Sequence, residues 1–289
     1  MIVTRFAPSP TGFLHLGHAY AAWFAFDLAV RAGGRFLLRI EDIDRTRYRE
    51  EFEVAIKEDL RWLGIGFEEP VRRQSEHFAD YAAALAQLDA AGLLYPCFCT
   101  RKEIADEIAR AGIAPGLGEI GPDGPIYPGT CRTLSPQTRS ERIASGSPYA
   151  LRLDTAKALA TLKSDLTFDE QGRGPGGETG TQVARPLLFG DVVLARKELP
   201  ASYHLAVVVD DALQGVTLVT RGQDLFPATH IQILLQALLN LPTPAYAHHR
   251  LILDAEGRKF SKRDKAVTLQ SLRLSGLQPA QIRSQLDLA

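Results

Sequence analysis

The chain has 289 residues, of which 45% are hydrophobic, and a formal net charge of −1. This length and apolar content allow a large buried core, which we expect to form one domain with an insertion rather than several independent domains. The small net charge excludes a global attraction to nucleic acid or membrane, so a polyanionic partner has to meet a local basic surface. Residues 250–289 provide one, with eight Lys and Arg against four Asp and Glu.

The sequence contains no recognisable targeting or membrane-spanning segment. The N-terminal residues MIVTRFAPSPTG lack the basic stretch and apolar core of a signal peptide. Nowhere does an uninterrupted apolar run approach the roughly 20 residues that a membrane span needs. We therefore expect a cytoplasmic protein without membrane contact, and a monomer.

The first predicted elements alternate between strand and helix. Residues 2–8 (IVTRFAP) are typical of a short buried strand, residues 17–34 of a helix that ends in two glycines, and residues 35–42 (RFLLRIED) of a second strand. This order predicts a right-handed crossover within a parallel sheet. Apolar stripes predict two further helices, one from Phe52 to Leu63 and one from Phe78 to Leu88.

The character of the chain changes between Cys97 and Ala184. Gly and Pro are frequent in GIAPGLGEIGPDGPIYPGT and QGRGPGGETGTQ, which is typical of a loop-rich insertion, and TRKE at 100–103 offers a capping box for a short helix. Alternation in YHLAVVVDDALQGVTLVTRG then predicts two strands about a short turn. A helix over 228–240 and a strand near 248–254 follow.

These elements predict an α/β fold whose Rossmann-type parallel sheet is split by the insertion. We expect the first half of the main domain at residues 1–96 and the inserted module at 97–184. The second half is expected at 185–265, followed by a short helical C-terminal segment at 266–289.

The loop of the first crossover, APSPTGFLHLGH, has residues suited to a phosphate site. Pro8 stiffens the loop, Gly17 permits close backbone approach, and His15 and His18 stand where the helix begins. A helix N-terminus presents free N–H groups and a partial positive charge, so phosphate binds there readily, and two imidazoles could add hydrogen bonds to a nucleoside triphosphate. A capped crossover with two surface histidines is the alternative.

A second basic loop follows the last predicted strand, in LILDAEGRKFSKRD. Lys259, Ser261, Lys262 and Arg263 have the chemistry to hold charge that builds on phosphoryl oxygens. Taken alone, such a loop is more often a solvated surface. The two loops together indicate a nucleotide site far more specifically than either does.

The two loops resemble the signature sequences of class I aminoacyl-tRNA synthetases, in HLGH and KFSKR. The surrounding sequence is similar to the catalytic domain of the glutamyl branch, in RFAPSPTGFLHLGHA, LLRIEDIDRTR, RQSE, YHLAVVVDDALQGVTLVTRGQDL and LILDAEGRKFSKRD. The resemblance covers nearly the whole chain. It implies a ligase that activates L-glutamate with ATP, accompanied by Mg²⁺, and transfers it to tRNA.

Full-length glutamyl-tRNA synthetases continue past the lysine loop into helical anticodon-binding domains, whereas this sequence has only residues 266–289 there. In that respect it resembles a paralogue family, the glutamyl-queuosine tRNA(Asp) synthetases. The resemblance implies tRNA-independent activation of glutamate and its transfer to the queuosine base in the anticodon of tRNA(Asp). The expected partners are ATP, L-glutamate and tRNA(Asp) that carries queuosine.

Carried over to this sequence, the resemblance implies that glutamate is bound by Arg5, Ser9, Glu41, Tyr203 and Arg221. Their chemistry agrees, because a carboxylate can accept from the ammonium and arginines offer forked donors to carboxylates. ATP is expected at Pro8, His15, Gly17, His18, Lys259, Ser261, Lys262 and Arg263. Of these, His15, His18 and Lys262 are the predicted catalytic residues. The bound carboxylate is itself the nucleophile, so activation needs positioning and charge stabilisation rather than a general base.

One position departs from the glutamyl pattern. Gln223 stands in RGQD, where full-length glutamyl enzymes usually have Glu. A contact to ATP is therefore not carried over to it.

The three cysteines stand in YPCFC and PIYPGTC. On their own, Cys97, Cys99 and Cys131 fit either reduced thiols or a metal site, and they cannot form a closed disulfide framework. In the resembling family a zinc ion is held by three Cys and one Tyr at this spacing, which here implies Cys97, Cys99, Tyr127 and Cys131. A structural zinc site would give order to a Gly- and Pro-rich insertion.

Two other functions fit parts of the sequence. A glutamyl-tRNA synthetase fragment would charge the 3′ end of tRNA(Glu) and would differ only in its acceptor. A catalytically retired synthetase body would act as an RNA-binding module. Such a module has no chemical reason to keep the histidine pair, Lys262 and the glutamate pocket together.

Overall fold

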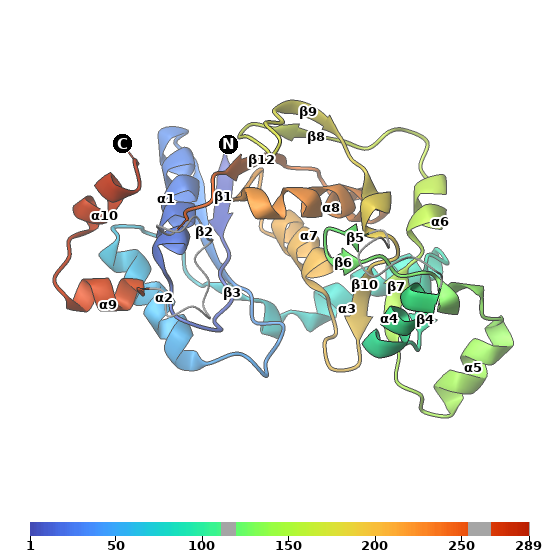
Figure 1. Cartoon of the computed structure of the whole chain (residues 1–289). Helices are drawn as coiled ribbons and strands as arrows, with labels where there is room; N and C mark the ends of the chain where they lie inside the picture. Colours follow the sequence, from blue (N-terminus) through green and yellow to red (C-terminus); the bar gives the residue numbers. More distant parts are fainter. Residues whose placement is uncertain (111–119, 254–266, 289) are drawn as a thin grey trace.

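The structure of the chain is a computed structural model that describes residues 1–110, 120–253 and 267–288. Figure 1 shows two parts, with the N-terminal and C-terminal segments in one and the middle of the chain in the other. Within the described ranges, the helices are all too short or too polar to cross a membrane.

The N-terminal part alternates between strand and helix, as the sequence predicts. Its elements are β1 (Val3–Phe6), α1 (Leu16–Arg31), β2 (Arg35–Ile40), α2 (Glu50–Trp62), β3 (Arg72–Arg73), the 3₁₀ turn η1 (Gln74–Glu76) and α3 (Phe78–Ala90). β1 pairs parallel with β2, and β2 pairs parallel with β3. α1 buries Tyr20 and Trp23 in a core shared with β2 and α2. Packed in this way, α1 begins at the carboxyl end of β1.

A second parallel pair, β11 (Leu218–Gly222) and β12 (Ala245–His249), lies beside the first set. The Thr217 N–H donates to the Val3 carbonyl at 3.0 Å, and the Val3 N–H donates to Thr217 Oγ1 at 2.9 Å. The parallel strands therefore follow the order β3-β2-β1-β11-β12. From β1, the chain adds β2 and β3 on one side and later adds β11 and β12 on the other, so the topological switch point lies between β1 and β11. Ligands of open α/β sheets bind at such a point, outside the carboxyl ends of the strands. The predicted α/β fold with a Rossmann-type parallel sheet is confirmed.

Residues Tyr203–Leu213 form helix α7, so the strand predicted there is wrong. A short apolar run rich in valine does not by itself distinguish a buried strand from a buried helix. Ser202 caps the helix, because its hydroxyl accepts from the Leu205 N–H at 3.4 Å. α7 packs against α3 and α8 (Phe226–Leu238), and every residue from His204 to Asp211 is buried, so no polar face marks the helical period.

The middle of the chain contributes strands to two sheets. β4 (Leu94–Cys97), β7 (Ala150–Leu153) and β10 (Val193–Arg196) form an antiparallel sheet. β8 (Thr167–Glu170) and β9 (Gly180–Val183) extend the parallel sheet beyond β12. Both sheets therefore combine strands from inside and outside residues 97–184.

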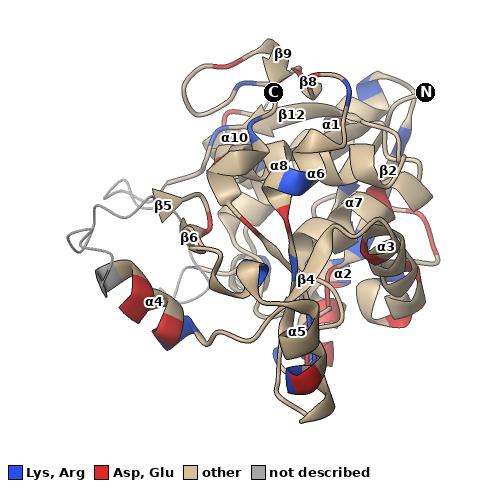
Figure 2. Cartoon of the chain, turned by 90° about the vertical axis from the view of Figure 1, so that its right-hand side faces the viewer, with Lys and Arg blue, Asp and Glu red and all other residues tan. Residues whose placement is uncertain are grey.

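The remaining elements are short, and Figure 2 shows several of them around these strands. They are α4 (Arg101–Arg110), β5 (Ile120–Gly121), β6 (Gly124–Pro125), η2 (Thr130–Thr133), α5 (Pro136–Ala144), α6 (Thr155–Ala160), η3 (Pro186–Phe189) and η4 (Gln223–Leu225). The predicted capping box precedes α4: the Glu103 carboxylate accepts from the Thr100 N–H at 2.7 Å, and Thr100 Oγ1 accepts from the Glu103 N–H at 3.2 Å.

The C-terminal segment returns to the N-terminal part as two short helices, α9 (Leu269–Leu274) and α10 (Pro279–Gln285). Leu269 is fully buried, and its N–H donates to the Leu14 carbonyl at 2.8 Å, which sets Thr268 opposite His15. Arg273 pairs with Glu58 on α2 at 2.9 Å and lies 3.4 Å from Asp59. The segment after residue 267 is therefore helical, as predicted, and is joined to the start of α1.

The contact between α9 and α2 contains a buried acid that costs stability when it is charged. Neither carboxylate oxygen of Asp59 makes a hydrogen bond within the described part of the chain. Burial raises the pKa of Asp59 from 3.8 to about 6, although Arg273 opposes the rise. Because the pKa is higher in the folded state, protonation stabilises the fold at low pH, and this contribution is lost as the pH rises through 6.

We predict that Asp59→Asn is more stable than the unaltered chain above pH 6, by about 1–2 kcal/mol, because the amide carries no charge to bury. Urea denaturation at pH 5 and pH 8 measures this, and the difference in unfolding free energy should grow with pH. The control is Glu58→Gln, an exposed neighbour that also contacts Arg273. A gain that is equal at both pH values, or a loss at pH 8, would contradict the prediction.

Candidate active site

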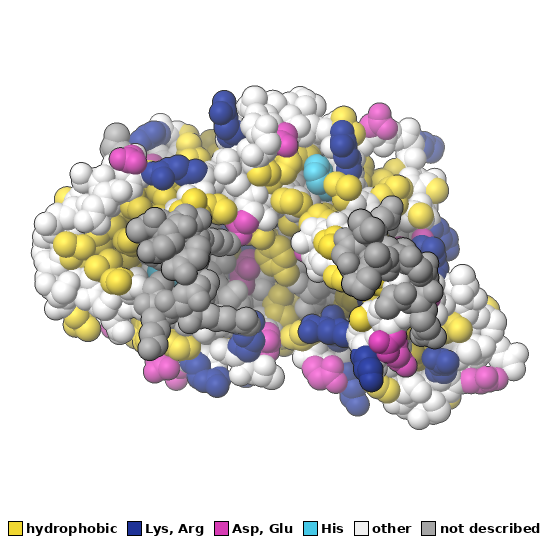
Figure 3. Space-filling view, viewed as in Figure 1, with side chains coloured by type: hydrophobic (Ala, Val, Ile, Leu, Met, Phe, Trp, Pro, Cys, Tyr) yellow, Lys and Arg dark blue, Asp and Glu magenta, His cyan; other side chains and the backbone are white. Residues whose placement is uncertain are grey.

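A cavity of about 760 Å³ lies at the carboxyl ends of β1, β2 and β11. Figure 3 shows the molecule hollowed between its two parts. The lining residues come from the ends of the parallel strands, from the start of α7 and from β10, and they include Arg5, Pro8, Ser9, His18, Glu41, Arg47, Gln74, Arg196, Tyr203 and Arg221. All five predicted glutamate-binding residues therefore line one cavity at the switch point of the sheet.

Arg5, at one wall of the cavity, is bound to an acid that the sequence analysis missed. Its Nε lies 2.9 Å from Asp211 Oδ1, and its NH1 donates to the Thr220 carbonyl at 3.0 Å. Arg39 contacts the same carboxylate at 2.6 Å. Burial alone would raise the pKa of Asp211, but Arg5 and Arg39 hold that pKa below its ordinary value. Arg5 thus faces the cavity with much of its charge already compensated.

Glu41 is the acidic group of this wall. It contacts Arg39 at 3.1 Å, and its side chain remains 12% exposed toward the cavity. Burial raises the pKa of Glu41 above its ordinary value, although Arg39 and Arg5 favour the charged form. A ligand cation that reached Glu41 would favour the carboxylate form further.

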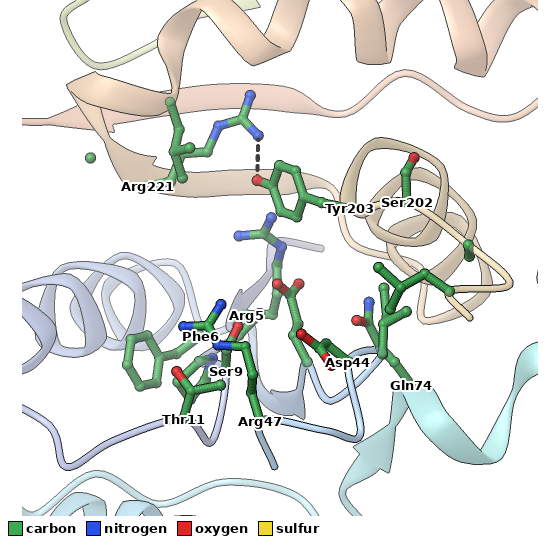
Figure 4. Close-up of a pocket in the computed structure, with 18 of the residues that line it drawn as sticks. Arg5, Phe6, Ser9, Thr11, Asp44, Arg47, Gln74, Ser202, Tyr203 and Arg221 are labelled. Atoms are coloured by element: carbon green, nitrogen blue, oxygen red, sulfur yellow. Dashed lines mark hydrogen bonds between the residues drawn. The ribbon is translucent and has the colours of Figure 1, made fainter. Parts of the chain in front are cut away.

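Arg221 also lines the cavity, and among the described residues all its hydrogen-bond acceptors are uncharged. Its guanidinium donates to Thr229 Oγ1 at 2.6 Å, Gln232 Oε1 at 2.7 Å, His248 Nε2 at 3.1 Å and the Tyr203 hydroxyl at 3.4 Å. Figure 4 shows the contact with Tyr203 above the cavity, with Arg5, Ser9 and Arg47 below it. A cavity lined by a carboxylate and by a cation without a direct carboxylate partner suits a ligand that carries both charges.

His15 and His18 begin α1 and act as its cap. His15 Nδ1 accepts from the Gly17 N–H at 3.2 Å, and His18 Nδ1 accepts from the His15 N–H at 3.2 Å. The centres of the two imidazole rings lie 3.8 Å apart, and His18 lines the cavity. A side chain at Gly17 would place its Cβ 3.1 Å from His15 Cε1, so glycine leaves room for this ring. The histidines therefore cap the N-terminus of α1, and His18 brings it to the edge of the cavity.

The remaining predicted ATP-binding residues, Lys259, Ser261, Lys262 and Arg263, lie outside the described residues. The chain on either side of them is fixed, by β12 before and by the pairing of Leu269 with Leu14 after. His249, at the end of β12, contacts Tyr20 and Phe24 on α1, and Leu14 directly precedes the N-cap residue of that helix.

The side-chain amide of Gln223 is hydrogen-bonded to backbone carbonyl groups of this chain. Its Nε2 donates to the Arg173 carbonyl at 3.0 Å and to the Gly174 carbonyl at 3.3 Å. A glutamate has no proton to donate at neutral pH, so it could not make these bonds. The departure from the glutamyl pattern is thus explained by the loop between β8 and β9.

The three cysteines form a cluster with Tyr127. Their Sγ atoms lie within 4.8 Å of one another, and Cys99 Sγ is 3.4 Å from Cys131 Sγ and 3.5 Å from the Tyr127 hydroxyl. Tetrahedral zinc with bonds near 2.3 Å needs sulfur atoms about 3.8 Å apart, so the four groups fit a metal ion. Burial raises the pKa of the Cys99 thiol to about 12, so a thiolate at this position requires a cation.

Several residues of the site carry no sequence signal of their own. Asp211 stands in the apolar run VVVDDAL, where a pair of acids within a buried segment indicates buried partners. His248 and Glu170 are far apart in the sequence, and only the pairing of β8 with β12 brings them behind Arg221.

Comparison with known proteins agrees with this geometry. The family model described as tRNA synthetases class I (E and Q), catalytic domain, matches residues 1–288. A glutamyl-Q tRNA(Asp) synthetase of Rhodobacter capsulatus is 48% identical over 99% of this chain and 100% of its own length. A glutamate–tRNA ligase of Aquifex aeolicus is 38% identical over 99% of this chain, which spans 57% of that protein.

A solved structure is similar as well. The glutamate–tRNA synthetase of Elizabethkingia anophelis superposes with a TM-score of 0.75 and 29% identity, over 91% of this chain and 53% of that one. The match of the family model over nearly the whole chain, together with these relatives, shows that the chain belongs to the class I tRNA synthetases of the glutamate and glutamine branch and is a ligase of that family.

Proposed function

We propose that the chain activates L-glutamate with ATP, without tRNA, and transfers the glutamyl group to the queuosine base in the anticodon of tRNA(Asp). The observation that carries the first half is the cavity at the switch point, which both Glu41 and Arg221 line. The acceptor rests on the relatives, since proteins of Rhodobacter capsulatus and Symbiobacterium thermophilum that match 100% and 83% of their length are named glutamyl-Q tRNA(Asp) synthetases.

In this proposal the cavity recognises glutamate by charge. Glu41 accepts from the substrate ammonium, and Arg221 donates to a substrate carboxylate while Tyr203 and Ser9 add hydroxyl groups. Arg5 serves the second carboxylate with the donors that Asp211 and Thr220 leave available. Glutamine would leave Arg221 facing an uncharged amide in a largely buried site, which opposes its binding.

The activation step needs no general base, because the substrate carboxylate attacks the α-phosphate directly. His15, His18, Pro8, Gly17 and the N-terminus of α1 bind the ATP phosphates, since a helix N-terminus favours anions. Lys259, Ser261, Lys262 and Arg263 complete the site, with Lys262 stabilising charge on the leaving pyrophosphate. Mg²⁺ enters with ATP and neutralises part of that charge.

The acceptor distinguishes this function from a second one. A glutamate–tRNA ligase would esterify a 3′ end instead, and proteins with that name match this chain at 38% identity. Both activities share the first step, so the decision lies in the transfer.

A transfer assay with radiolabelled glutamate and ATP tests the acceptor. We expect the chain to label tRNA(Asp) that carries queuosine. Unmodified tRNA(Asp) and tRNA(Glu) are the matched controls, and neither should be labelled. Label on tRNA(Glu) would replace the proposed acceptor with a 3′ end. Failure of glutamate-dependent ATP–pyrophosphate exchange would overturn the activation step itself.

Lys262→Ala should reduce glutamate-dependent ATP–pyrophosphate exchange by at least about a hundredfold, because a cation that meets charge developing in the transition state contributes several kcal/mol. The control is Lys265→Ala, which removes a charge three residues away. Circular dichroism should be unchanged in both variants. An exchange rate in Lys262→Ala equal to that of the unaltered chain would contradict the role of Lys262.

We also propose that Cys97, Cys99, Tyr127 and Cys131 hold a structural zinc ion. Elemental analysis of protein purified without chelator should find about one equivalent per chain, because the four groups satisfy a tetrahedral ion. Cys131→Ser should lose the metal and lower the melting temperature, since metal binding and local folding are coupled. Less than about 0.2 equivalents in the unaltered chain would contradict the proposal.

A further inference from the structure

Arg5 and Arg221, which both line the cavity, are held in different ways. Arg5 is paired directly with a carboxylate, that of Asp211. Arg221 has no such partner among the described residues, and Glu170 is separated from it by the imidazole of His248. Arg221 is therefore oriented by a carboxylate that does not neutralise it through direct contact.

The proton positions in this chain of contacts follow from the groups themselves. The Arg221 Nε can only donate, so His248 Nε2, 3.1 Å away, must accept. His248 Nδ1 lies 2.6 Å from Glu170 Oε2, and a carboxylate can only accept, so Nδ1 carries the proton. The two neighbours of the ring thus select the same tautomer independently.

Glu170 is itself fixed by backbone groups. Its side chain has no exposed area, and Oε1 accepts from the N–H groups of Gly172 and His248, both at 2.9 Å. With Oε2 on the imidazole, both oxygens are used. The backbone approaches closely here, because a Cβ on Gly172 would lie 2.4 Å from the His248 carbonyl oxygen. The start of the β8–β9 loop is therefore fitted against β12 at the residue that contacts Arg221.

The imidazole has no freedom to turn away. Its ring centre is 5.1 Å from that of Phe226, nearly edge-on, and lies parallel to the Tyr246 ring at 6.2 Å. The guanidinium of Arg221 also lies over Tyr246, at 5.4 Å from the ring centre. Burial lowers the pKa of His248, although its bond to Glu170 opposes this, so the ring is neutral at neutral pH.

We propose that Glu170 and His248 are positioning residues that aim Arg221 at the substrate carboxylate and leave its charge available for that contact. This inference rests on the proposed function, since it concerns how the same cavity selects glutamate. It predicts that substitutions of Glu170 or His248 change the KM for glutamate and the preference of the enzyme for glutamate over glutamine. The KM for ATP should stay constant.

The decisive change is Glu170→Gln. The two backbone N–H groups keep the amide oxygen in the place of Oε1, so the amide NH₂ faces His248 Nδ1. The imidazole must then carry its proton on Nε2, where it opposes the N–H of Arg221. The KM for glutamate in ATP–pyrophosphate exchange should rise about tenfold, the effect of one hydrogen bond to a charged group. The matched control is Asp169→Asn, the same chemical change on the exposed face of β8.

A second pair of variants tests the acceptor itself. His248→Gln can offer an amide oxygen to Arg221, whereas His248→Leu cannot, and both lose the bond between imidazole and Glu170. His248→Gln should therefore keep the KM for glutamate within about threefold of the unaltered value, and His248→Leu should raise it about tenfold or more. This pair decides the question if Glu170→Gln does not fold.

The tautomer gives a readout that does not depend on activity. In ¹⁵N-histidine-labelled protein, the His248 ring, assigned by its absence in His248→Gln, should be protonated at Nδ1 and should change to Nε2 in Glu170→Gln. A ring protonated at Nε2 in the unaltered chain would overturn the inference. So would an unchanged KM for glutamate in Glu170→Gln while the unaltered chain is active. Absence of glutamate-dependent exchange in the unaltered chain would overturn the proposed function, and the inference with it.

Discussion

The structure depends on two adjacent acids, Asp210 and Asp211, in the buried helix α7. Asp210 accepts from Arg72 at 2.8 Å, from Gln74 at 2.7 Å and from Tyr81 at 3.0 Å. The Asp211 carboxylate accepts hydrogen bonds from Arg5 on β1 and from Arg39 on β2. Isolated charges cannot be buried at this depth, so the acids and their partners stabilise the fold only as a set. Through them, one helix of the middle part is bound to three parallel strands, β1, β2 and β3, and the first two of these end at the cavity.

The sequence predicted the parts of the fold that have a local signal. The strand–helix–strand unit at the N-terminus, the start of α1 at His15 and the capping box before α4 each consist of residues within reach of one another along the chain. The cavity residues could be predicted because the sequence around them resembles that of a known family. The fold brings these residues together in one cavity.

The errors have physical causes as well. α7 is enclosed on all sides, so its hydrophobic pattern has no helical period, and its valines favoured a strand. The acid partners of Arg5 and the support of Arg221 could not be predicted, because they depend on strand order and on register. The single pairing of Tyr246 with Glu170 brings an acid from the middle of the chain behind a residue of β11, and neither sequence neighbourhood indicates it.

The pairing of Leu269 with Leu14 has a consequence for the order in which the enzyme forms during synthesis. The cavity is lined by β1 from the first residues and by β11 from the last third of the chain, and the return segment pairs with His15 only after Thr268 is made. Contacts this distant in sequence form late, because the loops that they close are long. A nascent chain therefore contains His15 and His18 long before the segment that pairs beside them has been made. The start of α1 gains this part of its packing only after Thr268 and Leu269 have been synthesised.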